Sequence, residues 1–390
     1  MIDIKRKEDC VGCNACVQIC PKTCISFNPD EQGFFYPKVD LDKCINCHLC
    51  ERVCPVLNQG KESEAPKAYA AKNIDAAIKK DSSSGGVFFA LAKRVIEEGG
   101  VIFGARFNKE WKVEHGYGED LEGVKKFQGS KYLQSQIGES FIKVEQFLKK
   151  GRKVLFSGTP CQVAGLRLFL RKDYGDQLVL VDTACHGVPS PLVWNEYLDY
   201  VGTANDFTLD SITDISFRDK RNGWDKYGMR IVSRNGGMQK EWYSPMHGNI
   251  YMRGFLKDLY IRPSCFACPA KCGKSGSDLT LADFWGIQNN YPELYEKGYY
   301  SLVIDRKGIL DTVSDFKSIE TEVIDIKLAY KNNPALLTSA EKPKLYHQFW
   351  ELWSEMKVSA ITLILNRMKP SILMRIIRKL KRIITKYISH

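Results

Sequence analysis

Two copies of one cysteine pattern carry much of the chemistry that this sequence can offer. In each copy, four cysteines are separated by two, two and three residues, and a proline follows: Cys10, Cys13, Cys16, Cys20 and Pro21, then Cys44, Cys47, Cys50, Cys54 and Pro55. This spacing is typical of a bacterial ferredoxin that binds two 4Fe–4S clusters. Zinc and disulfides are the alternatives, but a zinc site uses two cysteine pairs that lie far apart in the sequence.

The longer gap and the proline send the fourth cysteine of each copy to the other cluster. We therefore expect Cys54 to join Cys10, Cys13 and Cys16 at one cluster. Cys20 then joins Cys44, Cys47 and Cys50 at the second. Cys24 is left over, and we expect it to be a small buried residue rather than a ligand.

A further group of cysteines could hold a third centre. Cys265, Cys268 and Cys272 lie within eight residues, and Cys161 and Cys185 each follow a predicted strand, where an α/β sheet presents its ligand-binding loops. Five cysteines are thus available for a cluster that needs four. Taken alone, Cys161 and Cys185 could be buried apolar residues. Zinc held by the other three and one more residue is the main competing interpretation.

The pattern of elements predicts an α+β or α/β chain in which a small domain precedes a larger one. Residues 1–57 form a two-cluster ferredoxin-like domain, 58–67 a polar linker, 68–338 a mixed α/β domain, and 339–390 a helical tail. Within the larger domain, strands alternate with helices as far as about residue 205, and a helix is expected to run from Ser82 to Glu98. After Phe207 the sequence predicts mainly strands, and residues 234–237 are typical of a hairpin turn.

Composition indicates an ordinary folded protein with a basic end. Hydrophobic residues make up 44% of 390, and the net charge is +11. Nine lysines and arginines and no acidic residue fall within 357–390, so the body of the chain is nearly neutral. The start of the sequence has no apolar signal core, and no stretch reaches the length of a spanning helix. We expect a cytoplasmic protein, as suits iron–sulfur chemistry.

The basic tail predicts a contact with a membrane surface. Apolar residues recur at helical spacing between Ile372 and Ile388, with Arg375, Lys379 and Arg382 among the cations of the other face. Such a helix lies on the inner face of a bilayer and does not cross it, and 358–365 adds apolar residues. The alternative is a helix docked on the protein itself or on a partner. No nucleic acid is expected, because aliphatic residues rather than stacking aromatics interleave the cations.

The sequence resembles the coenzyme F-420 hydrogenase/dehydrogenase beta-subunit family. The matching stretches begin with Ser83-Ser-Gly-Gly-Val, Gly129-Ser-Lys-Tyr-Leu and Phe156-Ser-Gly-Thr-Pro-Cys, and continue at Cys185-His-Gly-Val-Pro and from Arg262 to the Ala-Asp-Phe-Trp-Gly at 282–286. The resemblance implies a flavoprotein that binds FAD and a 4Fe–4S cluster in an α/β domain. It also implies that Cys161, Cys185, Cys265 and Cys268 hold that cluster, while Cys272 lies outside the family motif.

Three short segments are candidates for binding FAD. Ser84, Gly85 and Gly86 at a helix start could offer backbone N–H groups to a pyrophosphate, although a plain helix N-cap is the alternative. The second segment, Ser130, Lys131 and Tyr132, could supply a cation and hydroxyls. The third, Gly158, Thr159 and Pro160, is a strand-to-helix turn that a cofactor could approach closely.

A basic and aromatic run is the candidate substrate site. Its residues are Arg218, Lys220, Arg221 and Trp224, which suit a phosphorylated or carboxylated ligand, and a solvated turn is the alternative. His186 and His247 are candidate proton donors, although a lone histidine is more often structural.

These features predict an iron–sulfur flavoprotein oxidoreductase. Electrons would pass between a partner protein, such as a ferredoxin or a hydrogenase-like subunit, and FAD by way of the clusters. The small-molecule substrate would be a deazaflavin coenzyme or a sugar- or lipid-linked intermediate, because similar proteins with the run at 217–224 look like those of surface-polysaccharide synthesis. The alternative is an electron-transfer subunit that serves a partner enzyme and has no substrate of its own.

Overall fold

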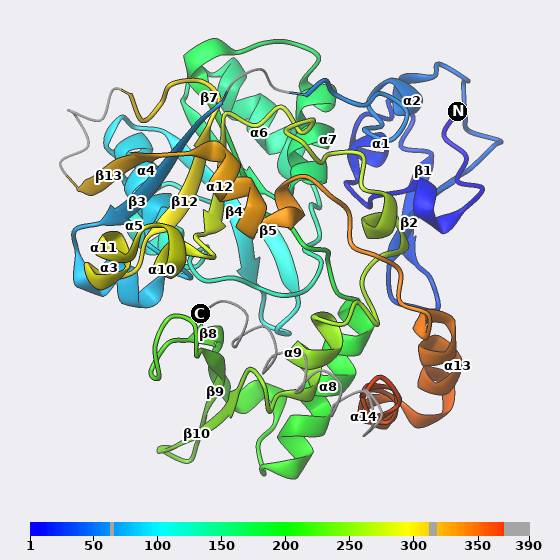
Figure 1. Ribbon diagram of the computed structural model, residues 1–390. Helices are drawn as coiled ribbons and strands as arrows, with labels where there is room; N and C mark the ends of the chain where they lie inside the picture. Colours follow the sequence, from blue (N-terminus) through cyan, green and yellow to red (C-terminus); the bar gives the residue numbers. More distant parts are fainter. Residues whose placement is uncertain (63–65, 312–317, 370–390) are drawn as a thin grey trace, which may run out of the picture.

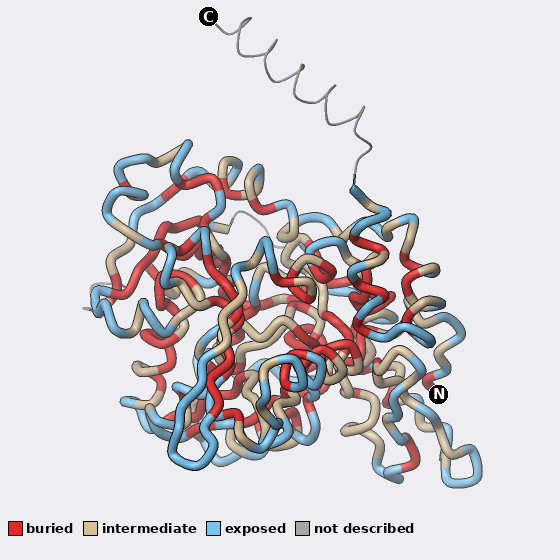
Figure 2. Tube along the Cα trace, turned by 90° about the horizontal axis from the view of Figure 1, so that it is seen from below, coloured by how far each residue is buried: buried red, intermediate tan, exposed pale blue. Residues whose placement is uncertain are grey.

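The computed structural model describes residues 1–62, 66–311 and 318–369, and Figure 1 shows three parts within them. A small N-terminal domain lies beside a large sheet covered by helices, and a second, smaller sheet with its own helices lies beneath the large one. Buried positions run through the interior of this assembly, whereas hairpin tips and helix ends are exposed (Figure 2). The mixed α/β class predicted from the sequence is confirmed.

The N-terminal domain repeats one local structure twice. Its first half has η1 (Lys7–Asp9), α1 (Ala15–Gln18) and β1 (Ile25–Pro29), and its second half has β2 (Phe35–Val39) and α2 (Leu49–Arg52). The strands β1 and β2 pair antiparallel. Both short helices begin after a left-handed residue, Asn14 at φ 61° and His48 at φ 59°. This reversal curls the chain so that consecutive cysteines of each motif face one centre.

The large sheet has the strand order β13-β3-β12-β11-β7-β6-β4-β5. Its strands are β3 (Lys67–Asn73), β4 (Val101–Phe107), β5 (Val113–Gly118), β6 (Val154–Gly158), β7 (Leu178–Thr183), β11 (Leu279–Asp283), β12 (Ser301–Asp305) and β13 (Ile319–Ile324). Neighbours from β4 to β11 are parallel, and β12 pairs antiparallel with both β11 and β3. The carboxyl ends of β3, β4, β6, β7 and β11 therefore meet at one edge, where α/β sheets bind ligands.

Helices cover the large sheet and bury its apolar residues. They are α3 (Ala76–Asp81), α4 (Val87–Glu97), α5 (Leu121–Lys125), α6 (Ser140–Lys149), α7 (Pro160–Leu170), α10 (Ile287–Asn290), α11 (Pro292–Glu296) and α12 (Ile326–Asn332), with short turns η2 (Gly175–Gln177) and η6 (Pro334–Leu336). The prediction of one helix from Ser82 to Glu98 is wrong at its start. A first helix ends at Asp81, and α4 begins only after Gly86, whose φ of 82° favours glycine.

The smaller sheet, in the order β10-β9-β8, forms the second layer. It comprises β8 (Ile212–Asp219), β9 (Gly228–Asn235) and β10 (Met238–Pro245), with η3 (Leu209–Ser211), α8 (Pro191–Ala204), α9 (Ile250–Phe255) and η4 (Pro263–Ala267) around it. The predicted hairpin is present, because Asn235 pairs with Met238.

Part of the predicted tail belongs to this second layer. Helices α13 (Tyr346–Met356) and α14 (Val358–Arg367) bury Phe349, Trp353 and Ile361 in the same core as Trp194 of α8 and Met252 of α9. Residues 358–367 therefore form a helix docked on the protein's own body, which was the alternative to a membrane contact for this segment. The residues predicted to lie on a membrane, 372–388, fall outside the described part of the chain. Within that part, no helix combines the length and apolarity that crossing a bilayer requires.

Candidate metal centres and cofactor site

The first cysteine set, Cys10, Cys13, Cys16 and Cys54, gathers on the side of the N-terminal domain that faces α7. Burial and the neighbouring thiols of Cys16, Cys54 and Cys10 raise the pKa of Cys13. Cys13 also belongs to the core that contains Val163 and Leu166 of α7. The structure thus brings together the four thiols that the crossing pattern predicts.

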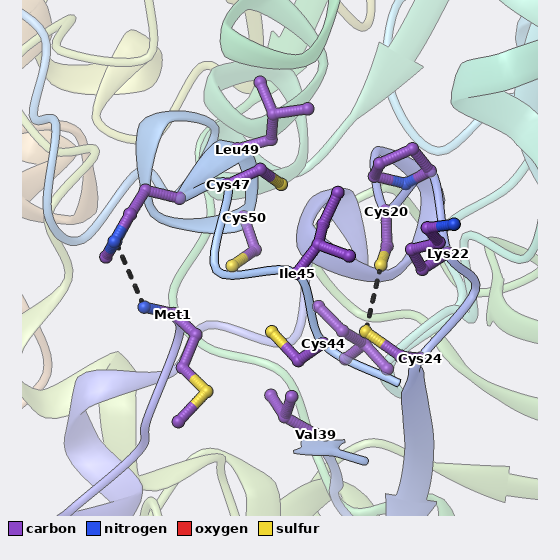
Figure 3. A pocket seen from close by; sticks show the side chains of 13 residues that line it. Met1, Cys20, Lys22, Cys24, Val39, Cys44, Ile45, Cys47, Leu49 and Cys50 are labelled. Carbon is purple, nitrogen blue, oxygen red and sulfur yellow. Dashed lines mark hydrogen bonds between the residues drawn. The ribbon is translucent and has the colours of Figure 1, made fainter. Parts of the chain in front are cut away.

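The second set lines a cavity at the outer end of the same domain. Cys20, Cys44, Cys47 and Cys50 all face it, and Figure 3 shows their sulfur atoms around a common space. The backbone N–H of Ile2 donates to Cys50 Sγ at 3.2 Å. The loop that carries Cys44 and Cys47 is open to solvent, since Leu41 and Ile45 are 63% and 57% exposed. This second set is therefore near the surface.

The third set comes from three separate segments. Cys161 lies in the first turn of α7, Cys185 directly after β7, and Cys265 and Cys268 in and just after η4. Burial raises the pKa of Cys161, Cys185 and Cys265 to about 12, and each of these shifts is enlarged by other thiols of the same set. Four partly buried thiols with one another as neighbours are the donor set that a 4Fe–4S cluster requires, because bound iron would stabilise their thiolates.

Cys272 lies apart from this group. Its Sγ lies 3.1 Å from the carbonyl oxygen of Leu337, and its backbone is left-handed at φ 55°. Of the five cysteines predicted for the third centre, the structure brings together four.

The first and third sets meet across α7. A Cβ atom added to Gly165 would lie 3.0 Å from both Cβ and Sγ of Cys13. Cys161 lies one helical turn before Gly165 on the same helix. Gln18 joins the N-terminal domain to the neighbouring helix α6, since its Oε1 accepts from the backbone N–H groups of Phe141 at 3.0 Å and Ile142 at 3.2 Å. The absence of a side chain at Gly165 is what allows the close approach.

Arg262 is a buried cation at this junction. It is fully buried and donates to Cys10 O at 2.8 Å, Phe35 O at 2.9 Å and Gln134 Oε1 at 3.0 Å. Its guanidinium also lies 4.4 Å from the ring centre of Tyr36. It makes no ion pair with the acidic residues of 1–62, 66–311 and 318–369. A buried positive charge beside two thiol sets suits anionic groups bound there.

Two of the predicted FAD segments approach each other at the carboxyl edge of the large sheet through Ser83, the residue before the first segment. Ser83 Oγ lies 2.7 Å from Ser130 Oγ and accepts from Ser130 N at 2.6 Å. Helix α4 starts beside this contact with no side-chain cap, so the N–H groups of its first turn have no partner within the helix. The third segment, 158–160, begins α7 next to Cys161, and Thr159 Oγ1 lies 3.3 Å from that sulfur.

Some polar atoms of these segments make hydrogen bonds within the protein instead of being available to a cofactor. Ser84 Oγ donates to Tyr300 O at 3.1 Å, and Gly85 N donates to Ser301 Oγ at 2.9 Å. Lys131 Nζ donates to the carbonyls of residues 126, 128 and 129, at 2.8 to 3.2 Å. The N–H of Gly85 is thus not free, and the Lys131 ammonium caps the end of α5.

Arg218 lies buried between the two sheets. Its Nη1 donates to the Asp283 carboxylate and lies 3.3 Å from Tyr132 Oη, and the guanidinium stacks on the Tyr227 ring at 4.2 Å. Among the residues that the structure describes, its Nε and Nη2 are buried without a hydrogen-bond partner, and the same is true of Nε1 of Trp224. Unpaired buried donors are costly, so these three atoms point to a missing acceptor.

The rest of the predicted substrate run divides between interior and surface. Trp224 is buried and its ring lies 4.8 Å from that of Trp285. Lys220 Nζ donates to Lys79 O at 2.5 Å and Ser82 O at 2.6 Å, and burial lowers its pKa to about 8. Arg221 pairs at the surface with Asp219 and Glu241, at 2.9 and 2.7 Å. Arg221 therefore fits the alternative of a solvated turn.

Sequence reasoning missed the roles of Asp283 and Trp285. Both lie at the end of the strand β11 at the ligand-binding edge, within the Ala-Asp-Phe-Trp-Gly stretch that supported the family resemblance. An acidic residue at the end of a parallel strand was the signal that could have identified them.

His186 lies between the third cysteine set and Arg218. Its Nε2 is 2.6 Å from Asp258 Oδ1, and its ring lies 5.6 Å from Phe255, which is 5.3 Å from Tyr132. His247 is exposed in the turn before α9. Of the two predicted proton donors, only His186 is near the other candidate residues.

Comparisons with known proteins give two family matches. Residues 151–327 match the C-terminal region that defines the beta subunit of coenzyme F420 hydrogenase/dehydrogenase, and residues 9–58 match the 4Fe-4S dicluster domain. A chain of the F420-reducing [NiFe] hydrogenase complex from Methanosarcina barkeri is 17% identical. That match covers 71% of this chain and 90% of that chain at a TM-score of 0.46. No curated protein matches the sequence.

Proposed function

We propose, from the match of residues 151–327 to the coenzyme F420 hydrogenase/dehydrogenase beta-subunit family, that the chain is an oxidoreductase of this kind with three 4Fe–4S clusters and FAD. Bound clusters carry single electrons, whereas a flavin exchanges two electrons or a hydride. The first two cysteine sets would hold the clusters of the dicluster domain. The third cluster would be held by Cys161, Cys185, Cys265 and Cys268.

The observation that carries this proposal is the succession of the three sets. The second set opens to solvent near Ile45, the first lies inward of it, and Cys13 of the first contacts Gly165, one turn from Cys161 of the third. Arg262, buried between the first and third sets, would compensate their negative charge when they hold iron. A continuous series of thiol sets from surface to interior is what electron transfer to a buried cofactor needs.

The carboxyl edge of the large sheet would hold FAD. The uncapped start of α4 after Gly86 suits a pyrophosphate, and the Ser83–Ser130 contact holds the neighbouring loop beside it. Ser84, Tyr132 and the turn 158–160 complete this set of candidates. The unpaired donors of Arg218 and Trp224 support the presence of a polar ligand nearby.

The substrate would be an anionic molecule with a planar or ring-shaped part. The Nε–Nη2 edge of Arg218 matches a carboxylate or phosphate, and Trp285, 38% exposed against Trp224, offers a ring surface. A deazaflavin coenzyme and a sugar- or lipid-linked intermediate both have this chemistry. Asp258 would orient His186 as a proton donor near Tyr132. A peripheral membrane position of the chain would suit a lipid-linked substrate.

The direct test is the cofactor content of anaerobically prepared protein. We expect the absorbance spectrum after acid release to show about one FAD per chain, and Arg218→Gln to weaken reduction of an anionic substrate. Arg221→Gln is the matched control, because Arg221 is paired at the surface. Protein that contains iron and sulfide but no flavin would contradict the FAD assignment.

An electron-transfer subunit without its own substrate is the second candidate. It is favoured by the exposed loop around Ile45 and by the description of the family as a beta subunit. A chain that purifies with clusters, lacks flavin and binds a second subunit would support this candidate over the enzyme.

A further inference from the structure

The second cysteine set has a fifth thiol, although four would satisfy a cluster. Cys24 is 5% exposed and lines the same cavity as Cys20, Cys44, Cys47 and Cys50. Its Sγ lies 3.4 Å from Cys20 Sγ, the contact that Figure 3 marks with a dashed line. Its thiol also neighbours Cys44. Cys24 is thus buried, as the sequence predicts, in a small core with Ile2 and Ile25, and its sulfur lies beside that of a candidate ligand.

The backbone holds this thiol in place. Cys24 directly precedes β1, and its carbonyl accepts from Asp40 N at 2.8 Å. The backbone N–H of Thr23 donates to the carbonyl oxygen of Cys20 at 3.2 Å and closes the turn between the two cysteines. Either sulfur of the 3.4 Å contact could donate, but a metal ligand is a thiolate, so the proton would lie on Cys24 when Cys20 holds a cluster.

The other half of the repeat provides an internal comparison. Cys54 occupies the position that corresponds to Cys20, and Asn58 the position that corresponds to Cys24, each 34 residues later in the sequence. The backbone N–H of Asn58 donates to the carbonyl oxygen of Cys54 at 2.9 Å. The amide of Asn58 donates to the carbonyls of Glu51 at 2.6 Å and Cys54 at 3.1 Å and not to a sulfur. The two centres thus differ by one thiol donor.

We propose that Cys24 is a positioning residue whose S–H group donates to the Cys20 ligand sulfur and makes the second cluster easier to reduce than the first. A hydrogen bond to a ligand sulfur stabilises the extra negative charge of the reduced cluster, and such bonds help to set cluster potentials. The proposal rests on the proposed ligation by Cys20, Cys44, Cys47 and Cys50. It explains how two centres built from one repeat can have different potentials.

The test is a redox titration of the full chain, reconstituted under anaerobic conditions and followed by electron paramagnetic resonance. We expect Cys24→Ala to retain the wild-type iron content and to move one N-terminal cluster to a more negative potential. Cys24→Ser, whose hydroxyl still donates, is expected to fall between that variant and the wild type. Asn58→Ala, at the matching position of the other half, is expected to leave the second cluster unchanged.

Two results would overturn the inference, and a third would overturn its premise. Unchanged potentials in Cys24→Ala with full iron content would show that the thiol does not act on the cluster. Loss of that cluster's iron in both Cys24→Ala and Cys24→Ser would show that Cys24 is itself a ligand. Failure of the wild-type chain to take up the two N-terminal clusters would contradict the proposed function instead.

Discussion

The N-terminal domain and the large-sheet domain each gather cysteines into sets of four, but they do so by different means. In the N-terminal domain a short motif curls around its own centre, helped by the left-handed residues Asn14 and His48. In the larger domain the thiols come from the ends of two strands and a distant loop, between Cys161 and Cys268. The first kind of set depends on local geometry, and the second depends on the whole sheet.

The difference also concerns exposure. The second set lies near solvent-exposed Ile45, whereas Cys161, Cys185 and Cys265 are so well enclosed that burial raises their pKa to about 12. A local motif can therefore lie at the surface, while a set built by the sheet is enclosed beside the carboxyl edge of the large sheet. The following changes test this division, from the largest expected effect to the smallest.

Cys265→Ser should impair the third cysteine set and leave the two N-terminal sets unaffected. It removes one thiol of the third set while leaving the N-terminal motifs intact, so the N-terminal clusters should still be reduced but electron delivery to flavin should fall to background. Rapid-mixing absorbance spectroscopy with a chemical reductant measures both steps. Cys272→Ser is the matched control, because Cys272 faces Leu337 rather than the third set. Equal loss in both variants would contradict the assignment.

Arg262→Gln should loosen the junction between the regions. The change leaves buried acceptors at Cys10, Phe35 and Gln134 without their donor, which we expect to lower the free energy of unfolding by about 3–4 kcal/mol. Urea titration under argon, followed by tryptophan fluorescence, measures it. A change below about 0.5 kcal/mol, as for a surface substitution, would show that the bridge is not structural.

Gly165→Leu should push the regions apart. The added side chain meets Cys13, where even a Cβ atom would be only 3.0 Å away, and overpacking of this kind costs about 1–3 kcal/mol. Gly165→Ala is expected to have a smaller effect in the same urea titration. Arg167→Ala, exposed on the same helix, is the control that should remain close to wild type.

His115 should make the larger domain sensitive to acid. Burial lowers its pKa to about 4, although the ring bonds to Ser157 O at 3.0 Å and lies 3.0 Å from Ser135 Oγ. Because the unfolded chain binds a proton near pH 6.5 and the folded chain does not, stability is full above that pH and falls as the pH drops toward 4. We expect a loss of about 2 kcal/mol by pH 5.

The measurement is the urea midpoint as a function of pH, compared with His115→Gln. That variant should lose part of the pH dependence, whereas the exposed His247→Gln should keep it. Identical curves for His115→Gln and wild type between pH 6.5 and 4.5 would show that His115 is not the titrating group.

Local spacing is enough to predict which N-terminal cysteines form a set. The other site residues depend on long-range packing, which the sequence does not show. The pairing of Cys54 with Cys10, Cys13 and Cys16 is a prediction from gaps of two and three residues and a proline, whereas the contact of Cys272 with residue 337 is one that no spacing reveals. The helix start was misplaced because Ser82 resembles a cap, while the left-handed Gly86 is the actual one. Arg218 and Arg221 have different surroundings because Arg218, near the end of β8, reaches Asp283, whereas Arg221 lies in the turn that follows the strand. The sequence does not show this difference.

The central claim is that a third, sheet-built cysteine set holds a cluster in addition to the two of the ferredoxin-like motif. Iron and acid-labile sulfide, counted per chain in anaerobically reconstituted protein, test it most directly. We predict about twelve of each, from three 4Fe–4S clusters. About eight of each, with no further loss in Cys265→Ser, would contradict the account.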